Sequence, residues 1–215
     1  MDRCCRWMAH NQQPFEWCYP ADGDAFPAVG QHAGVIVFGG AGSANDDSEH
    51  DWVRQELQFI ESLLKAEVPF FGICLGAQML ARVLGSSVYT HPGELKEVGF
   101  HRIEPTEHSG DFLAEPLHVM QWHSEGFDLP AECELVAQGD VFPNQAFRLN
   151  QKTYGVQFHP EVNPDALSIW QERNRKRRPG QLDDAARARQ MEDALRYDQC
   201  NTEWLDGFLR RWTGK

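Results

Sequence analysis

The sequence lacks a long apolar run, and this absence argues against a membrane-spanning protein. A helix that crosses a bilayer needs roughly 20 consecutive apolar residues, and no stretch of the chain approaches that length. The first twenty residues do not match a signal peptide either, because Arg3, Arg6 and His10 interrupt any apolar segment. We therefore predict a cytoplasmic protein that does not enter the membrane.

The chain also lacks regular cysteine spacing and an excess of basic residues. Its six cysteines contain no CxxC pair, which argues against a disulfide framework or a zinc site and predicts reduced thiols. Lys and Arg number 20 against 32 Asp and Glu, a net charge of −12. An acidic body repels nucleic acid, and we predict no nucleic-acid partner. The exception is a basic run over 173–178, which we interpret as a solvated loop between two helices.

The apolar pattern predicts one α/β domain in three layers, with a mostly parallel sheet flanked by helices. The order strand, helix, strand, helix in the first half favours parallel pairing, and short strand-like pieces from 87 to 141 indicate antiparallel additions. Expected strands cover 15–19, 34–38 and 68–73, followed by a hairpin at 146–158; expected helices cover 2–11, 50–66, 77–84, 166–172, 181–197 and the surroundings of 204–212.

The stretch from Pro69 to Gln78 carries most of the chemistry. Cys74 lies where a buried strand is predicted to turn into a helix, between Gly72 and Gly76. So tight a turn has no room for neighbouring side chains, and the amino end of the following helix favours thiolate over thiol. This turn alone is compatible both with a reactive nucleophile and with a buried structural cysteine.

Two further segments could supply the remaining parts of a catalytic site. His159 and Glu161 lie two apart at the end of a predicted strand, and such a pair can take the proton of a sulfur and fix the imidazole tautomer. Spacing alone leaves a surface or hydrogen-bonded histidine as the alternative. The glycine-rich run 39–43 lacks nucleotide-loop spacings, but it could direct a backbone N–H at an anion.

Together, the segments GGA at 39–41, GICLGAQ at 72–78 and GVQFHPE at 155–161 resemble the class I (triad) glutamine amidotransferases. The resemblance covers about 21–170, and the joint occurrence of the last two motifs is highly specific. The middle segment, including EVG at 97–99 and QWH at 121–123, is similar to the free-standing GMP-synthase-like branch, which also contains γ-glutamyl peptidases.

The resemblance implies a flavodoxin-like fold and a role for each matching residue. Cys74 would be the nucleophile, His159 the general base and acid, and Glu161 the residue that orients His159. The N–H groups of Gly40 and Leu75 would form the oxyanion hole. Gln78, Trp122 and His123 would bind substrate. The implied reaction is hydrolysis of a γ-glutamyl amide through a thioester, with no metal or organic cofactor.

Three functions follow from this resemblance. The first is glutamine hydrolysis with ammonia passed to a separate synthetase, since no segment resembles an ATP-binding domain. The second is hydrolysis of a larger γ-glutamyl peptide, conjugate or polyamine without an acceptor protein. The third is a non-catalytic relative that keeps the fold.

The resemblance also suggests two departures at the ends of the chain. Family members usually open with a strand, and here Met1 falls almost directly on helix-like residues, so we expect a domain over 1–170 in which the first strand is missing or replaced. Residues 171–215 are expected to form a helical extension packed on the same domain.

Overall fold

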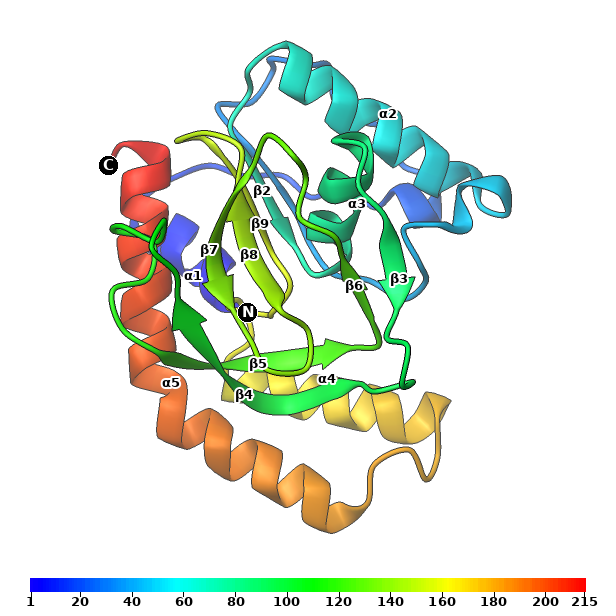
Figure 1. Cartoon of the computed structure of the whole chain (residues 1–215), viewed down its shortest axis with the longest axis vertical. Coiled ribbons are helices and arrows are strands. Elements are labelled where there is room, and N and C mark those ends of the chain that lie inside the picture. The colour runs from blue at the N-terminus through cyan, green and yellow to red at the C-terminus, as the bar shows by residue number, and fades with distance from the viewer.

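The computed structural model describes all 215 residues, and its framework is a seven-stranded mixed sheet covered by helices (Figure 1). The strand order is β1-β2-β9-β8-β7-β4-β5. The strands are β1 (Val35–Val37), β2 (Phe70–Ile73), β4 (Glu97–Pro105), β5 (Leu117–His123), β7 (Glu134–Gln138), β8 (Asn144–Arg148) and β9 (Thr153–Val156). A separate ribbon pairs β3 (Val88–Thr90) with β6 (Glu125–Phe127).

The parallel part of the sheet consists of β1, β2 and β9. Val37 lies opposite Gly72, and Ile73 lies opposite Val156. All four residues of β2 and of β9 are buried, as expected for parallel strands covered on both faces. Because parallel strands end at the same edge, the loops that follow β1, β2 and β9 come together there.

The remaining pairings, from β9 through β8, β7 and β4 to β5, are antiparallel. They confirm the predicted antiparallel additions, and the α/β fold with its helical tail is also confirmed. At the other side of the sheet, β1 is an edge strand that pairs with β2 alone.

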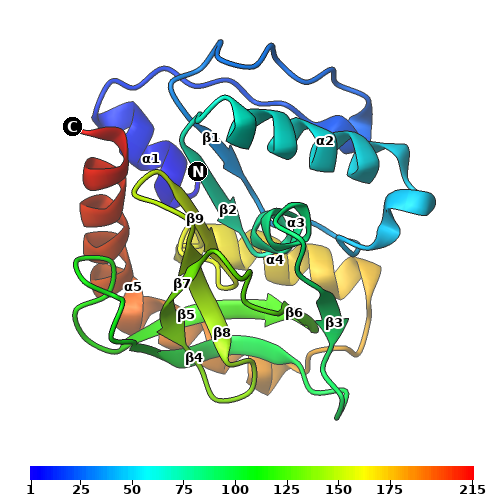
Figure 2. The same cartoon turned by 45° about the horizontal axis from the view of Figure 1, so that its top comes forward.

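Helices cover both faces of the sheet (Figure 2). They are α1 (Arg3–His10), α2 (Asp51–Lys65), α3 (Leu75–Val83), α4 (Pro164–Arg177) and α5 (Asp184–Thr213), with short 3-10 turns η1 (Pro20–Asp22) and η2 (Asp46–Ser48). Successive strand residues point to opposite faces: Phe71 packs with α1 and α5 residues in one core cluster, and Phe70 with α2 and α3 residues in the other.

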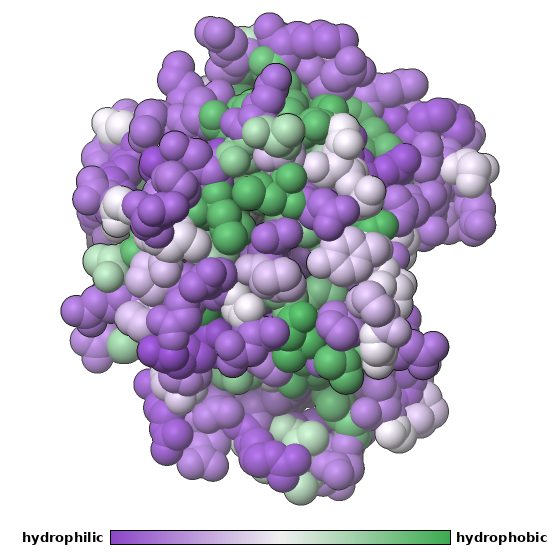
Figure 3. Space-filling model, in the orientation of Figure 1, coloured by the Kyte–Doolittle hydropathy of each residue, from purple (hydrophilic) through white to green (hydrophobic).

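The surface is mainly polar. In the face seen in Figure 3, hydrophilic residues cover most of the periphery, and apolar residues show mainly toward the middle. All six cysteines are free. None of the helices combines the length and the apolar character that crossing a membrane would require.

Three local predictions were wrong. The 15–19 stretch forms no strand, because no neighbouring strand pairs with it and Trp17 packs instead on Tyr19 and Phe38. The basic run is mostly the last turns of α4 and not a loop, where positive charge faces the negative end of the helix dipole.

The two helices predicted after residue 180 are one continuous helix, α5. Its buried residues are Gln190, Ala194, Asn201, Leu205, Phe208 and Leu209. Apart from the adjacent Phe208 and Leu209, these residues are separated by three, four or seven positions and form a single stripe against the sheet. Packing therefore maintains the helix through the polar stretch that the sequence pattern suggested as a break.

Candidate active site

Cys74 lies at the turn between β2 and α3 in a backbone conformation that few side chains adopt. Its φ is 51° and its ψ is −104°, which is strained for a residue with a Cβ. Its N–H donates to the Val156 carbonyl at 2.7 Å. A Cβ added at Gly72 would lie 2.6 Å from the Gly76 carbonyl, and one at Gly76 would meet the Val37 backbone. The small neighbours expected from the sequence are therefore a steric requirement.

His159 and Glu161 form a buried pair immediately beyond β9. The distance between His159 Nδ1 and Glu161 Oε1 is 2.8 Å, and the two residues are each 4% exposed. The His159 backbone N–H donates to the Met120 carbonyl at 2.8 Å, which fixes the loop against β5. The predicted pair is thus in direct contact.

The same loop brings His159 to Cys74. A Cβ on Gly39 would lie 2.6 Å from His159 Cε1 and 3.2 Å from Cys74 Cβ, so both side chains border one glycine. Burial by itself lowers the pKa of His159, but the charges of Glu161 and Cys74 outweigh it and raise the pKa from 6.5 to about 10. This environment favours the imidazolium form of His159.

The two predicted oxyanion-hole residues lie next to each other. A Cβ on Gly40 would be 3.3 Å from Leu75 Cδ2. Leu75 is the first residue of α3, so its N–H has no partner within the helix. A helix start beside a glycine-rich loop is a common arrangement for holding an anion.

The predicted substrate-binding residue Gln78 is buried and already makes side-chain hydrogen bonds. Its Nε2 donates to the Glu125 carbonyl at 3.0 Å and to Gln157 Oε1 at 3.2 Å. Gln157 in turn directs its Nε2 at Cys74 Sγ, 3.7 Å away. No role was predicted for Gln157, although it lies inside the GVQFHPE motif at 155–161.

Trp122 and His123 differ in their surroundings. His123 is buried: its Nδ1 lies 2.8 Å from the Glu125 carbonyl, and its Nε2 lies 3.0 Å from Glu97 Oε2 and 3.1 Å from Gln121 Oε1. Trp122 is half-buried and packs edge-on against Trp170, with ring centroids 6.0 Å apart.

Trp170 was missed by the sequence analysis. It lies on α4, and its ring is perpendicular to that of His159 with centroids 4.9 Å apart. Its position in a segment without a motif gave no signal of this contact. The helical tail therefore begins by covering one side of the catalytic histidine candidate.

Comparison with known proteins identifies the family. The family model described as glutamine amidotransferase class-I matches residues 17–168, well over half of the chain. The chain belongs to the class I glutamine amidotransferases. This confirms the resemblance stated above for the free-standing branch, because similar relatives include GMP synthase subunits that are separate chains.

Two relatives illustrate how far this amidotransferase matches known proteins. A subunit of the glutamine-hydrolysing GMP synthase of Methanopyrus kandleri is 31% identical over 144 residues, which are 63% of this chain and 72% of that protein. The glutamine amidotransferase-like protein YfeJ of Salmonella typhimurium is 27% identical over 175 residues, which are 75% of this chain and 71% of that protein.

Solved structures support the same assignment over the full length. A glutamine amidotransferase from Thermotoga maritima aligns with a TM-score of 0.90 and 29% identity, covering 100% of this chain and 93% of that one. A glutamine amidotransferase from Methylobacillus flagellatus aligns with a TM-score of 0.88 at 23% identity, covering 99% and 89%, and this likeness concerns the fold.

Proposed function

We propose that this amidotransferase hydrolyses a γ-glutamyl amide, with glutamine as the first candidate, through a Cys74-His159-Glu161 triad. The observation that carries the proposal is that His159 lies between Cys74 and Glu161 at the carboxyl edge of the parallel strands. The pair distance of 2.8 Å between His159 and Glu161 and the shared border at Gly39 support it. Family membership supports the reaction class.

In the proposed reaction, the Cys74 thiolate attacks the γ-carbonyl carbon, and the N–H groups of Gly40 and Leu75 stabilise the resulting oxyanion. His159 gives its proton to the departing amine, so ammonia leaves and a γ-glutamyl thioester remains. His159 then takes a proton from water, the hydroxide adds to the thioester, and glutamate leaves as the thiolate re-forms. Glu161 holds the imidazole orientation throughout.

Substrate and partner proposals follow from the relatives. Some similar proteins are subunits of glutamine-hydrolysing GMP synthases, and we extend this to the present chain as a proposal that a separate synthetase accepts its ammonia. In this proposal, Gln78 lines the substrate pocket, and the backbone of Trp122 and His123 contacts the α-amino and carboxylate ends of the substrate.

The test is glutamate release from glutamine and from a panel of γ-glutamyl peptides, conjugates and polyamines. We expect turnover that disappears in Cys74→Ala and persists in Cys200→Ala, a matched control because Cys200 is exposed and distant in sequence. Activity that survives Cys74→Ala would exclude the mechanism. Absence of both turnover and labelling by a γ-glutamyl chloroketone would favour the non-catalytic alternative.

One observation favours the second candidate, a hydrolase for larger γ-glutamyl compounds. Because His159 protonates the leaving amine, that amine must lie beside His159, and the Trp170 ring forms an aromatic wall against the His159 ring. Such a wall would contact an apolar or cationic extension on the amine. If Trp170 contacts this extension, Trp170→Ala lowers kcat/KM for a γ-glutamyl conjugate more than for glutamine.

A further inference from the structure

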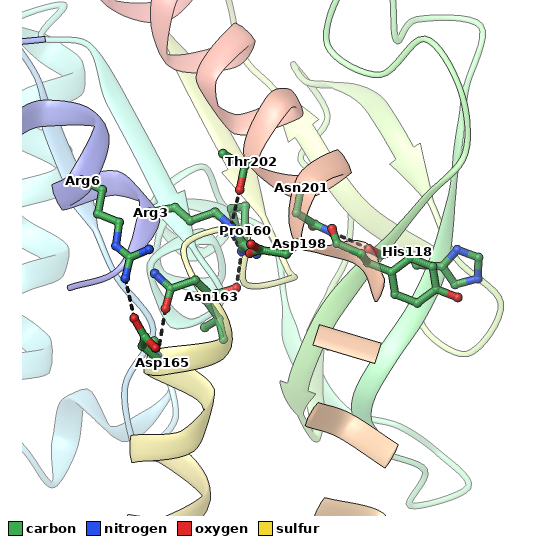
Figure 4. Close-up of polar contacts among 12 residues, drawn as sticks. Arg3, Arg6, His118, Pro160, Asn163, Asp165, Asp198, Asn201 and Thr202 are labelled. Atoms are coloured by element: carbon green, nitrogen blue, oxygen red, sulfur yellow. Dashed lines mark hydrogen bonds and ion pairs between the residues drawn. The ribbon is translucent and has the colours of Figure 1, made fainter. Parts of the chain in front are cut away.

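The loop that carries Glu161 is bound to the first residues of the chain. Arg3 contacts three successive carbonyls of this loop: its backbone N–H donates to Glu161 at 2.8 Å, and its Nη1 donates to Pro160 at 3.1 Å and to Val162. Figure 4 shows the Arg3 side chain extending from α1 to the loop before α4. One arginine therefore fixes the backbone on both sides of the proposed orienting carboxylate.

The tail helix α5 holds the other edge of the same guanidinium. Arg3 Nη2 lies 2.6 Å from Asp198 Oδ1, and Arg3 Nε donates to Thr202 Oγ1 at 3.0 Å (Figure 4). Arg3 is only 6% exposed. Burial lowers the pKa of Arg3, while the carboxylates of Asp198 and Glu161 oppose that change. The planar fork of an arginine suits this role, because it presents five donors in fixed directions.

Glu161 depends on its backbone for its position. Its Oε1 is bonded to His159, but its Oε2 is buried and has no hydrogen-bond partner. No second polar contact therefore fixes the carboxylate, and a small shift of residues 160–162 would move it relative to the imidazole.

We propose that Arg3 is a positioning residue for Glu161, held in place by Asp198 and Thr202, so that the helical tail acts on the active site through it. This inference rests on the proposed triad function. It gives α5 a role in catalysis besides covering the sheet.

Helix α1 supplies a matched control. Arg6 forms an ion pair with Asp165 at the same 2.6 Å distance, from the same helix to the start of α4, but its side chain is 51% exposed and that of Asp165 is 72% exposed. Arg6 makes no contact with the 160–162 carbonyls. Arg3→Gln and Arg6→Gln therefore remove the same charge from the same helix.

The experiment compares these variants after correction for active sites titrated with the γ-glutamyl chloroketone. We expect Arg3→Gln to lower kcat about 10- to 100-fold, the effect of a misplaced catalytic group, with a smaller change in KM. The high-pH limb of the rate profile should move to lower pH, because Glu161 no longer supports the His159 imidazolium. Arg6→Gln should retain the wild-type rate and profile.

Two further variants test whether Arg3 acts through its charge, through the stability of the fold or through the position that it gives Glu161. Arg3→Lys keeps the positive charge but not the fork, so it should retain most of the defect. Thr202→Val removes only the bond to Nε, which leaves the core intact and should produce a milder shift of the same limb. A purely structural role for Arg3 would instead lower the melting temperature and leave the rate per titrated site and the pH profile unchanged, which would overturn the proposal.

Failure of the proposed function would be recognised separately. If the wild-type protein turns over none of the substrates, the rate of Cys74 alkylation by iodoacetamide is measured against pH in the same variants. A shifted profile in Arg3→Gln but not in Arg6→Gln would still support positioning of the His159–Glu161 pair. Identical profiles in all variants would overturn it.

Discussion

Two buried histidine–glutamate pairs lie in this protein, and they differ in what each ring has left to do. The His159–Glu161 pair follows β9, and the His123–Glu97 pair joins β5 to β4. Their N–O distances, 2.8 and 3.0 Å, are nearly the same. His159 uses Nδ1 for its glutamate and lies beside Cys74, whereas His123 uses both ring nitrogens on oxygen atoms of the protein.

The difference teaches that burial and a carboxylate partner do not by themselves indicate catalysis. Glu97 Oε2 also accepts from Gln145 Nε2 at 2.9 Å, and Gln145 Oε1 accepts from Gln121. This closed network holds the β4–β5 ribbon against β8, where unpaired polar groups would be costly. The His159–Glu161 pair forms no such closed network, and His159 lies against the strained Cys74. We call it the open pair.

The largest effect is expected when the glutamate of each pair is replaced by glutamine. Glu161→Gln should lower kcat/KM about 10⁴-fold, as loss of the orienting carboxylate does in triads. Glu97→Gln should lower the free energy of unfolding by roughly 3 kcal/mol and keep activity per folded molecule within severalfold. Steady-state kinetics and urea unfolding measure both; equal kinetic losses would mean that the two pairs are not functionally distinct.

A smaller effect is expected at Gly39, which only the open pair borders. Gly39→Ala would place a Cβ 2.6 Å from His159 Cε1, so the ring must move, and we expect about a 10²-fold loss of kcat. Gly207→Ala on α5 is the control, since its Cβ would meet only the flexible end of Arg211 at 3.3 Å. Unchanged kinetics in Gly39→Ala would show that the ring can move without loss.

A smaller effect is expected in the pH dependence of stability, to which His159 of the open pair should contribute. The pKa of His159 is raised from 6.5 to about 10 by Glu161 and Cys74 in spite of burial, so the folded protein binds the proton more tightly than the unfolded chain. The resulting stabilisation is fully present below pH 6.5 and is lost as the pH rises through about 10. Urea unfolding of wild type and His159→Gln at pH 6 and 10 should converge at the higher pH; a constant difference would contradict this.

The smallest effect is expected at an exposed pair. Glu134 on β7 and Arg148 on β8 lie 2.7 Å apart, and hydrogen bonding to Arg148 lowers the pKa of Glu134. Water and salt screen such a pair, so Glu134→Gln should leave both the melting temperature and the kinetics unchanged within error. A clear loss of stability there would weaken the contrast between buried and exposed pairs.

The parts of this fold that follow local rules could be predicted from the sequence. The elbow at Cys74 is specified by glycines within two residues, and the pair His159 and Glu161 by its position after an apolar strand. Long-range contacts could not be predicted. Asn201 binds α5 to β5 by donating to the His118 carbonyl, and Arg3 contacts Thr202, 199 positions away. No local pattern encodes these partners.

The same reasoning explains the failure at 15–19. Alternating aromatics are typical of a strand, but a strand needs a neighbour for its backbone groups, and that neighbour is a property of the whole fold. Trp170 is the corresponding case at the site: a tryptophan on a helix is more often core than catalytic wall, and only the packing of α4 on the loop after β9 reveals its contact with His159.

The bond between Asn163 Nδ2 and the Met1 carbonyl, 2.9 Å long, has a practical consequence for handling this protein. Any peptide joined before Met1 emerges beside the loop that carries His159 and Glu161. A purification tag placed there would crowd this loop. A tag after Lys215 follows the exposed end of α5 beyond Gly214, and is the better choice for kinetic work.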